Sequence, residues 1–222
     1  MNTHTSSLIA LAALSLAGSA LNADILLESA LPTNTGHAVY VQNGVTITVD
    51  ASPRNFARKT VNGLTGIGIA DGNVTGEIDS SEYLRFTFSS AVKITGLSIA
   101  FLYADGNFGD VGNESAFIFA NNAKYTLGVS TATSGTWTGG GTISNDSIAN
   151  NSGGGGWVIA GNDIFSLGQT VTQIDLKAGN IGPNATYGDY AFRSVSWVVP
   201  APGTGALAGL GLLAAARRRR AQ

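Results

Sequence analysis

The 222-residue chain contains no cysteine. Disulfides, thiolate metal sites and cysteine catalysis are therefore excluded. Histidine is almost as rare, because His37 is the only one outside the first 23 residues. A single histidine excludes a two-histidine metal site and leaves one possible base for a Ser-His-acid arrangement. The polar stretch Thr35-Gly-His-Ala is typical of a solvated surface residue.

Familiar catalytic motifs are also absent from the sequence. It contains no Gly-x-Ser-x-Gly elbow, His-Glu-x-x-His pair or Walker loop. Closely spaced carboxylates occur at Glu77, Asp79 and Glu82, and strand alternation would place Glu77 and Asp79 on one face. Such a pair leaves open a secreted glycoside hydrolase, which needs two acids flanking a sugar bond. We nevertheless expect no catalytic residues.

Basic residues are scarce in residues 24–199. This segment holds eight lysines and arginines against 14 acidic groups, a formal charge of −6. A surface of that sign repels phosphate backbones, and the basic residues are scattered without a stripe. We therefore expect no nucleic-acid partner.

Apolar alternation predicts β-strands through most of residues 24–199, a length typical of one domain. No part of this segment shows a convincing helical period with caps. Strands are predicted in the following segments: 39–41, 45–50, 83–88, 92–103, 116–120, 125–129, 157–159, 171–176 and 195–199.

A change of alternation divides the strand around residue 95. Val92 and Ile94 share one parity, whereas the apolar residues from Leu97 onward share the other. An extra residue at Thr95-Gly96 would restore the inward direction, which predicts a β-bulge. Short strands, turns such as Asp71-Gly-Asn and the 30 glycines predict an all-β, antiparallel β-sandwich resembling a jelly roll, with a barrel as the alternative.

Residues 131–156 differ from the rest, since they are mostly Gly, Ser, Thr and Asn. This composition predicts a long flexible loop. Trp137 and Trp157 flank the segment and suggest a second interpretation, in which they stack on sugar rings. Trp197 shares a predicted strand face with Val195 and Val199, so we expect it in the core.

Oxygen donors cluster in Asp105-Gly-Asn-Phe-Gly-Asp110. Calcium takes six to eight oxygen ligands, and Asp105, Asn107 and Asp110 are the candidates for a structural Ca²⁺ site. The spacing does not match an EF-hand, because Ala116 stands where the bidentate Glu would be. Ordinary hairpin turns with solvated carboxylates are the alternative, and no other cofactor is indicated.

The N-terminus has the pattern of a secretory signal. Residues 8–17 are apolar, and Gly18-Ser19-Ala20 or Ala23 offers a small-residue cleavage site. The first seven residues contain no Lys or Arg, unlike a usual signal, so a buried helix is the alternative. We expect residues 1–23 to be a signal peptide.

The C-terminus combines a proline pair, an apolar stretch and an arginine run. Pro200-Ala201-Pro202 precedes the apolar residues 204–216, after which the chain continues with Arg217, Arg218, Arg219 and Arg220. Such a stretch can enter hydrocarbon as a helix, although 13 residues span only about 20 Å of a roughly 30 Å core. Four arginines cannot follow it, so we expect them to remain cytoplasmic as an anchor.

This tail resembles the bacterial PEP-CTERM sorting signal, with Pro-Ala-Pro in place of Pro-Glu-Pro. The resemblance implies export, brief membrane retention, cleavage near Pro200–Pro202 by an exosortase-like membrane protease, and release or attachment at the surface. Residues such as Gly76-Glu-Ile-Asp also look like the Gly- and Thr-rich β-domains commonly attached to such tails. Organisms with this system often make exopolysaccharide.

We therefore expect three parts: a signal peptide at 1–23, a β-sandwich at 24–199 and a sorting tail with a transmembrane helix at 200–222. The expected function is that of a non-enzymatic protein of the cell surface or extracellular matrix. A carbohydrate-binding module acting on exopolysaccharide is the first alternative.

Overall fold

The computed structural model describes residues 23–70, 74–79, 81–106, 112–147, 154–166, 168–179 and 188–201. The predicted signal peptide up to residue 22, the predicted apolar helix at 204–216, Pro202 and the four arginines lie outside these residues. Among the described residues, no helix combines the length and apolar character that a membrane crossing requires.

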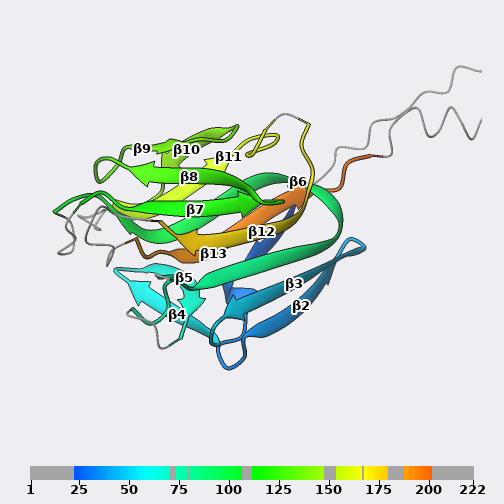
Figure 1. Cartoon of the computed structure of the whole chain (residues 1–222), viewed down its shortest axis with the longest axis horizontal. Helices are drawn as coiled ribbons and strands as arrows, with labels where there is room; N and C mark the ends of the chain where they lie inside the picture. The colour runs from blue at the N-terminus through cyan, green and yellow to red at the C-terminus, as the bar shows by residue number, and fades with distance from the viewer. Residues whose placement is uncertain are drawn as a thin grey trace, which may run out of the picture.

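The described chain is all-β, as predicted, and contains thirteen strands and one short 3-10 helix, η1 (Glu28–Ala30) (Figure 1). The strands are β1 (Asp24–Leu27), β2 (His37–Gln42), β3 (Val45–Ser52), β4 (Phe56–Val61), β5 (Leu64–Ile69), β6 (Tyr83–Tyr103), β7 (Ser115–Ala120), β8 (Ala123–Val129), β9 (Gly135–Trp137), β10 (Thr142–Asn145), β11 (Gly154–Ala160), β12 (Val171–Ala178) and β13 (Ala191–Val198).

Strand β6 connects two groups of strands. Its first half pairs with β3 and β12, and its second half pairs with β11 and β13, always antiparallel. The first group continues from β12 to β7, β8 and β9, and β2 pairs with the edge of β3 that faces away from β6. The second group contains β1, β4, β5, β10, β11 and β13. All thirteen strands thus belong to one hydrogen-bonded network, whereas the predicted sandwich has two separate sheets.

The bulge predicted at Thr95-Gly96 is confirmed. Ser196 pairs with Gly96 and Trp197 with Ile94, so Thr95 is the extra residue. The bulge keeps apolar side chains on the inner face on both sides of it, since Ile94 and Leu97 are both buried.

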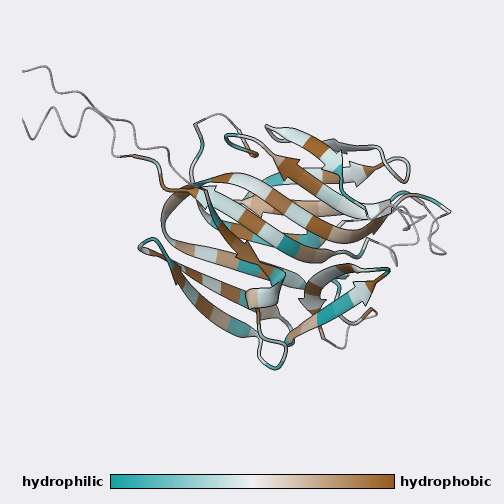
Figure 2. Ribbon diagram, turned by 180° about the vertical axis from the view of Figure 1, so that it is seen from behind, coloured by the Kyte–Doolittle hydropathy of each residue, from teal (hydrophilic) through white to brown (hydrophobic). Residues whose placement is uncertain are grey.

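The core lies between the two strand groups. Buried and partly exposed residues alternate along β3 and β7, and Figure 2 shows apolar positions recurring along the ribbons. Phe86 of the first group contacts Phe192 of the second at 4.8 Å between ring centroids. Phe88 and Trp197 meet in the same way at 5.7 Å. Trp197 and Val195 are buried as predicted, although Val199 on the same predicted face is 37% exposed.

The loop predicted at residues 131–156 is wrong where strands occur in it, at ten of its 26 residues. Strands β9 and β10 lie within it, and β11 begins at Gly154. The amide of Asn145 donates hydrogen bonds to the carbonyls of Ala132 (3.2 Å) and Gly156 (3.0 Å), which joins the two ends of the segment. Backbone pairing and these side-chain bonds supply the order that the apolar pattern could not reveal.

Candidate functional site

Both ends of the described chain lie at one end of the molecule. Asp24 pairs with Trp197, so the first residue of β1 lies beside the last residues of β13. Val198 pairs with Lys93, and the Asn43 amide donates a hydrogen bond to the Asp24 carboxylate. We call this region the exit end and define it by residues 23–25, 41–44 and 198–201 together with Lys93.

The sorting residues begin immediately after β13. Pro200 is half-buried and Ala201 is exposed, two and three residues beyond the end of the strand. They line an open hollow of about 620 Å³, whose other lining residues are Ala23, Lys93, Thr95, Gly161, Asn162 and Val198. The folded domain therefore reaches to within two residues of Pro200, and the start of the motif is accessible on its surface.

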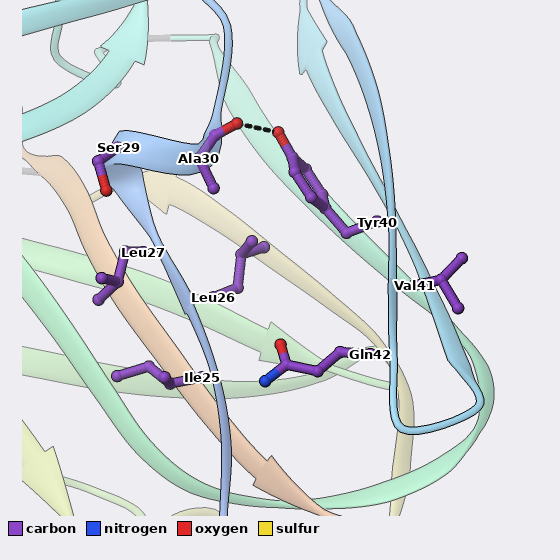
Figure 3. A pocket seen from close by; sticks show the side chains of 8 residues that line it. All are labelled: Ile25, Leu26, Leu27, Ser29, Ala30, Tyr40, Val41 and Gln42. Atoms are coloured by element: carbon purple, nitrogen blue, oxygen red, sulfur yellow. Dashed lines mark hydrogen bonds between the residues drawn. The ribbon is translucent and has the colours of Figure 1, made fainter.

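A second hollow of about 360 Å³ lies between β1 and β2 (Figure 3). The Tyr40 hydroxyl donates a hydrogen bond across it to the Ala30 carbonyl, and the Asn43–Asp24 bond joins the residues that follow β2 and begin β1, next to the hollow. Among the described strands, β1 pairs only with β13 and β2 only with β3. The hollow thus separates two strand edges that have no neighbouring strand among the described residues.

Exposed apolar side chains lie on the two strands that border this hollow and at the end of β13. In the described part of the chain, four of the five large exposed apolar residues belong to β1 or β2, and the fifth follows β13: Ile25 (49%), Leu27 (44%), Val39 (53%), Val41 (72%) and Val199 (37%). Sequence reasoning missed this feature. The available signal was that both faces of β2 are apolar, because Ala38 and Tyr40 alternate with Val39 and Val41.

The predicted sugar-binding tryptophans do not form an exposed pair. Trp157 is 1% exposed, and its indole N–H donates to the Leu102 carbonyl at 2.8 Å. A stacking role for Trp157 therefore does not fit its burial. Trp137 is half-buried, stacks on Tyr125 at 5.7 Å and donates to the Gly140 and Ile164 carbonyls. Sugar stacking by Trp137 stays a prediction.

The paired carboxylates lie inside the domain. Glu77 is 3% exposed, and its carboxylate accepts a hydrogen bond from Lys59 at 2.7 Å. Burial, and next the contact with Asp189, raise the pKa of Glu77 to about 8 against the opposing effect of Lys59. Burial also raises the pKa of Glu82 to about 7. The Glu82 carboxylate accepts the Asp79 backbone N–H at 3.0 Å.

Of the three proposed calcium ligands, Asp105 lies within the described residues. Asn107 and Asp110 lie outside the described residues. Asp105 is exposed, and its carboxylate accepts the Gly112 backbone N–H at 2.8 Å. Within the described ranges, no three His, Asp or Glu side chains gather closely enough to hold a metal. Calcium binding at Asp105 stays a prediction.

His37 lies at the surface, as expected. Its side chain is 61% exposed, and Nδ1 lies 2.7 Å from the Asp50 carboxylate. This pair is a surface contact between β2 and β3.

Comparison with known proteins identifies the tail. The family model of the PEP-CTERM protein-sorting motif matches residues 198–220, which confirms the resemblance. No curated protein and no solved structure matches the chain. The motif supports export through the membrane to the cell surface and processing by exosortase, a membrane protein.

Proposed function

We propose that residues 24–199 form a non-enzymatic protein of the cell surface or extracellular matrix, and that the tail delivers it there. The observation that carries the proposal is the position of the sorting motif, which begins at Val198, the last residue of β13. Cleavage near Pro200–Pro202 would then release a complete β-domain, because β13 pairs with β1, β5 and β6 upstream of the motif.

The packing of the domain supports a structural role. We infer that its two strand groups act as the two layers of a β-sandwich joined through β6. The contacts of Phe86 with Phe192 and of Phe88 with Trp197 support this interpretation, since inward aromatic residues from both layers form a sandwich core.

The buried carboxylates also favour a structural role of the domain, in preference to a glycoside hydrolase. A glycoside hydrolase presents two carboxyl groups to a sugar in an accessible cleft. Glu77, Asp79 and Glu82 are each at most 6% exposed, and Glu77 is paired with Lys59. These groups connect strands and turns of the domain, and none of them lines either of the two hollows described above.

The sorting part of the proposal is tested by intact-mass measurement of the surface and secreted fractions. We expect an N-terminus at Leu21 or Asp24 and a C-terminus near Pro200. Recovery of the full 222-residue chain from the medium would contradict this part.

Exopolysaccharide pull-down tests the role of the domain. We expect no retention of the secreted domain. Retention that is lost in Trp137→Ala at an unchanged melting temperature would favour the carbohydrate-binding module. Release of reducing sugar that is lost in Glu77→Gln would favour the hydrolase.

A further inference from the structure

The exit end exposes apolar side chains beside the sorting motif. Val41 is 72% exposed, Ile25 is 49% exposed and Val199 is 37% exposed. The Asn43–Asp24 hydrogen bond joins the end of the β2–β3 hairpin to the start of β1, which keeps Val41 and Ile25 at the same end as Val199. Figure 3 shows Ile25 and Val41 both directed away from the hollow between β1 and β2, on its opposite sides, so the two side chains flank this end of the molecule.

The distance from the folded domain to the apolar tail is short. Ala201 is the last described residue, and the apolar run of the sequence starts at residue 204. Three residues span at most about 10 Å even when fully extended. When the tail enters a membrane, the exit end must therefore lie within about 10 Å of the membrane surface.

The charges of the domain favour the same orientation. Both carboxylates nearest the exit end, Asp24 (7%) and Asp163 (5%), are buried, and Lys93 is half-exposed there. The described carboxylates that are not buried lie farther from the exit end: Glu28, Asp50, Asp105 and Asp146. A domain with a formal charge of −6 thus turns no exposed carboxylate of its described residues toward an anionic lipid surface at this end.

We propose that the exit end docks on the lipid surface that the tail enters, with Ile25, Val41 and Val199 in the interfacial region. This inference rests on the proposed sorting of the chain through its tail. Docking holds Pro200 and Ala201 at the membrane surface, where a membrane protease can reach them. Three apolar side chains form a weak, reversible contact by themselves, so the domain leaves the lipid once the tail has been removed.

The absence of cysteine permits a direct test in the full chain. Single cysteines replace Ile25 or Val41 and carry an environment-sensitive fluorophore, and the protein is reconstituted into vesicles of phosphatidylethanolamine and phosphatidylglycerol. Ser81→Cys is the matched control, because Ser81 is exposed just before β6, at the end of β3 opposite to Val45. A fourth label at Leu210→Cys reports whether the tail has entered the bilayer.

We expect blue-shifted emission and quenching by lipid-attached quenchers at positions 25, 41 and 210, with water-like emission at 81. A shift at 210 with water-like emission at 25 and 41 would overturn docking and leave sorting intact. Equal shifts at 25, 41 and 81 would also overturn it, because the contact would then lack a preferred end. Water-like emission at 210 would contradict membrane entry of the tail itself.

Discussion

Two buried tryptophans differ in one respect that mutation can isolate. Trp157 and Trp197 are 1% and 0% exposed, so both indoles are fully inside the domain. The Trp157 N–H donates to the Leu102 carbonyl at 2.8 Å, whereas the Trp197 N–H has no hydrogen-bond partner among the residues that the structure describes. Replacing each residue with Phe removes the same atoms. At position 157 the change removes a hydrogen bond, and at position 197 it removes a buried donor that has no partner.

The expected magnitudes follow from this difference. Both Trp→Phe changes lose packing of similar size, because both rings are fully buried. Trp157→Phe additionally loses a hydrogen bond, which contributes about 0.5–1.5 kcal/mol. Trp197→Phe instead removes a buried unsatisfied donor, whose burial costs about 1–3 kcal/mol. We therefore expect Trp157→Phe to be less stable than Trp197→Phe by about 1.5–4.5 kcal/mol.

Denaturant unfolding of the mature domain provides the measurement. A difference of this size corresponds to at least about 3 °C in melting temperature for a domain of this length. Trp197→Ala serves as the control for burial and should cost about 3–5 kcal/mol. Equal stability of the two Phe variants would refute the reasoning, since the hydrogen bond would then contribute nothing measurable.

Three further predictions concern the tail, the buried acid and a close backbone contact. Replacing the arginines at 217–220 with Gln removes the positive anchor, so unprocessed precursor should accumulate in the medium; unchanged retention and cleavage on immunoblots would show that the arginines are incidental. The free energy of unfolding should fall as pH rises from about 5 to 8, because folded Glu77 keeps a proton that the unfolded chain loses; Glu77 contributes at most about 1.4 kcal/mol per pH unit to this fall, and Glu82 adds to it up to about pH 7. The melting temperature of Glu77→Gln should depend less on pH over this range than that of the wild type. An equally steep fall in the variant would assign the effect to another group. Gly68→Ala should cost about 1–3 kcal/mol, because a Cβ there would lie 2.4 Å from the Glu77 backbone; a wild-type melting temperature would contradict the close contact.

The alternation of apolar residues was sufficient to predict most of the long strands. Segments 45–50, 83–88 and 116–120 each lie inside an observed strand, because each buries one face and leaves the other partly exposed. The shift of parity at Thr95 predicted the bulge for the same reason, since the inner face must remain apolar on both sides of it.

Strands whose order depends on hydrogen bonds could not be predicted in this way. β9 and β10 contain few apolar residues, and backbone pairing with β8 and β11 holds them in place. The failure is physical, because every residue carries the same backbone donor and acceptor and the sequence pattern does not show where they pair.

The sequence by itself determined that the protein carries a sorting tail, that it lacks cysteine chemistry and that its body is built from strands. These properties follow from composition and local order, which do not depend on how distant segments meet. Only the tertiary structure decided that Trp157 is buried, that Glu77 is enclosed with Lys59 and Asp189, and that Ile25, Val41 and Val199 share the exit end. Each of these depends on the pairing of strands far apart in the chain, such as β1 with β13, and that pairing is set by the packing of the whole domain.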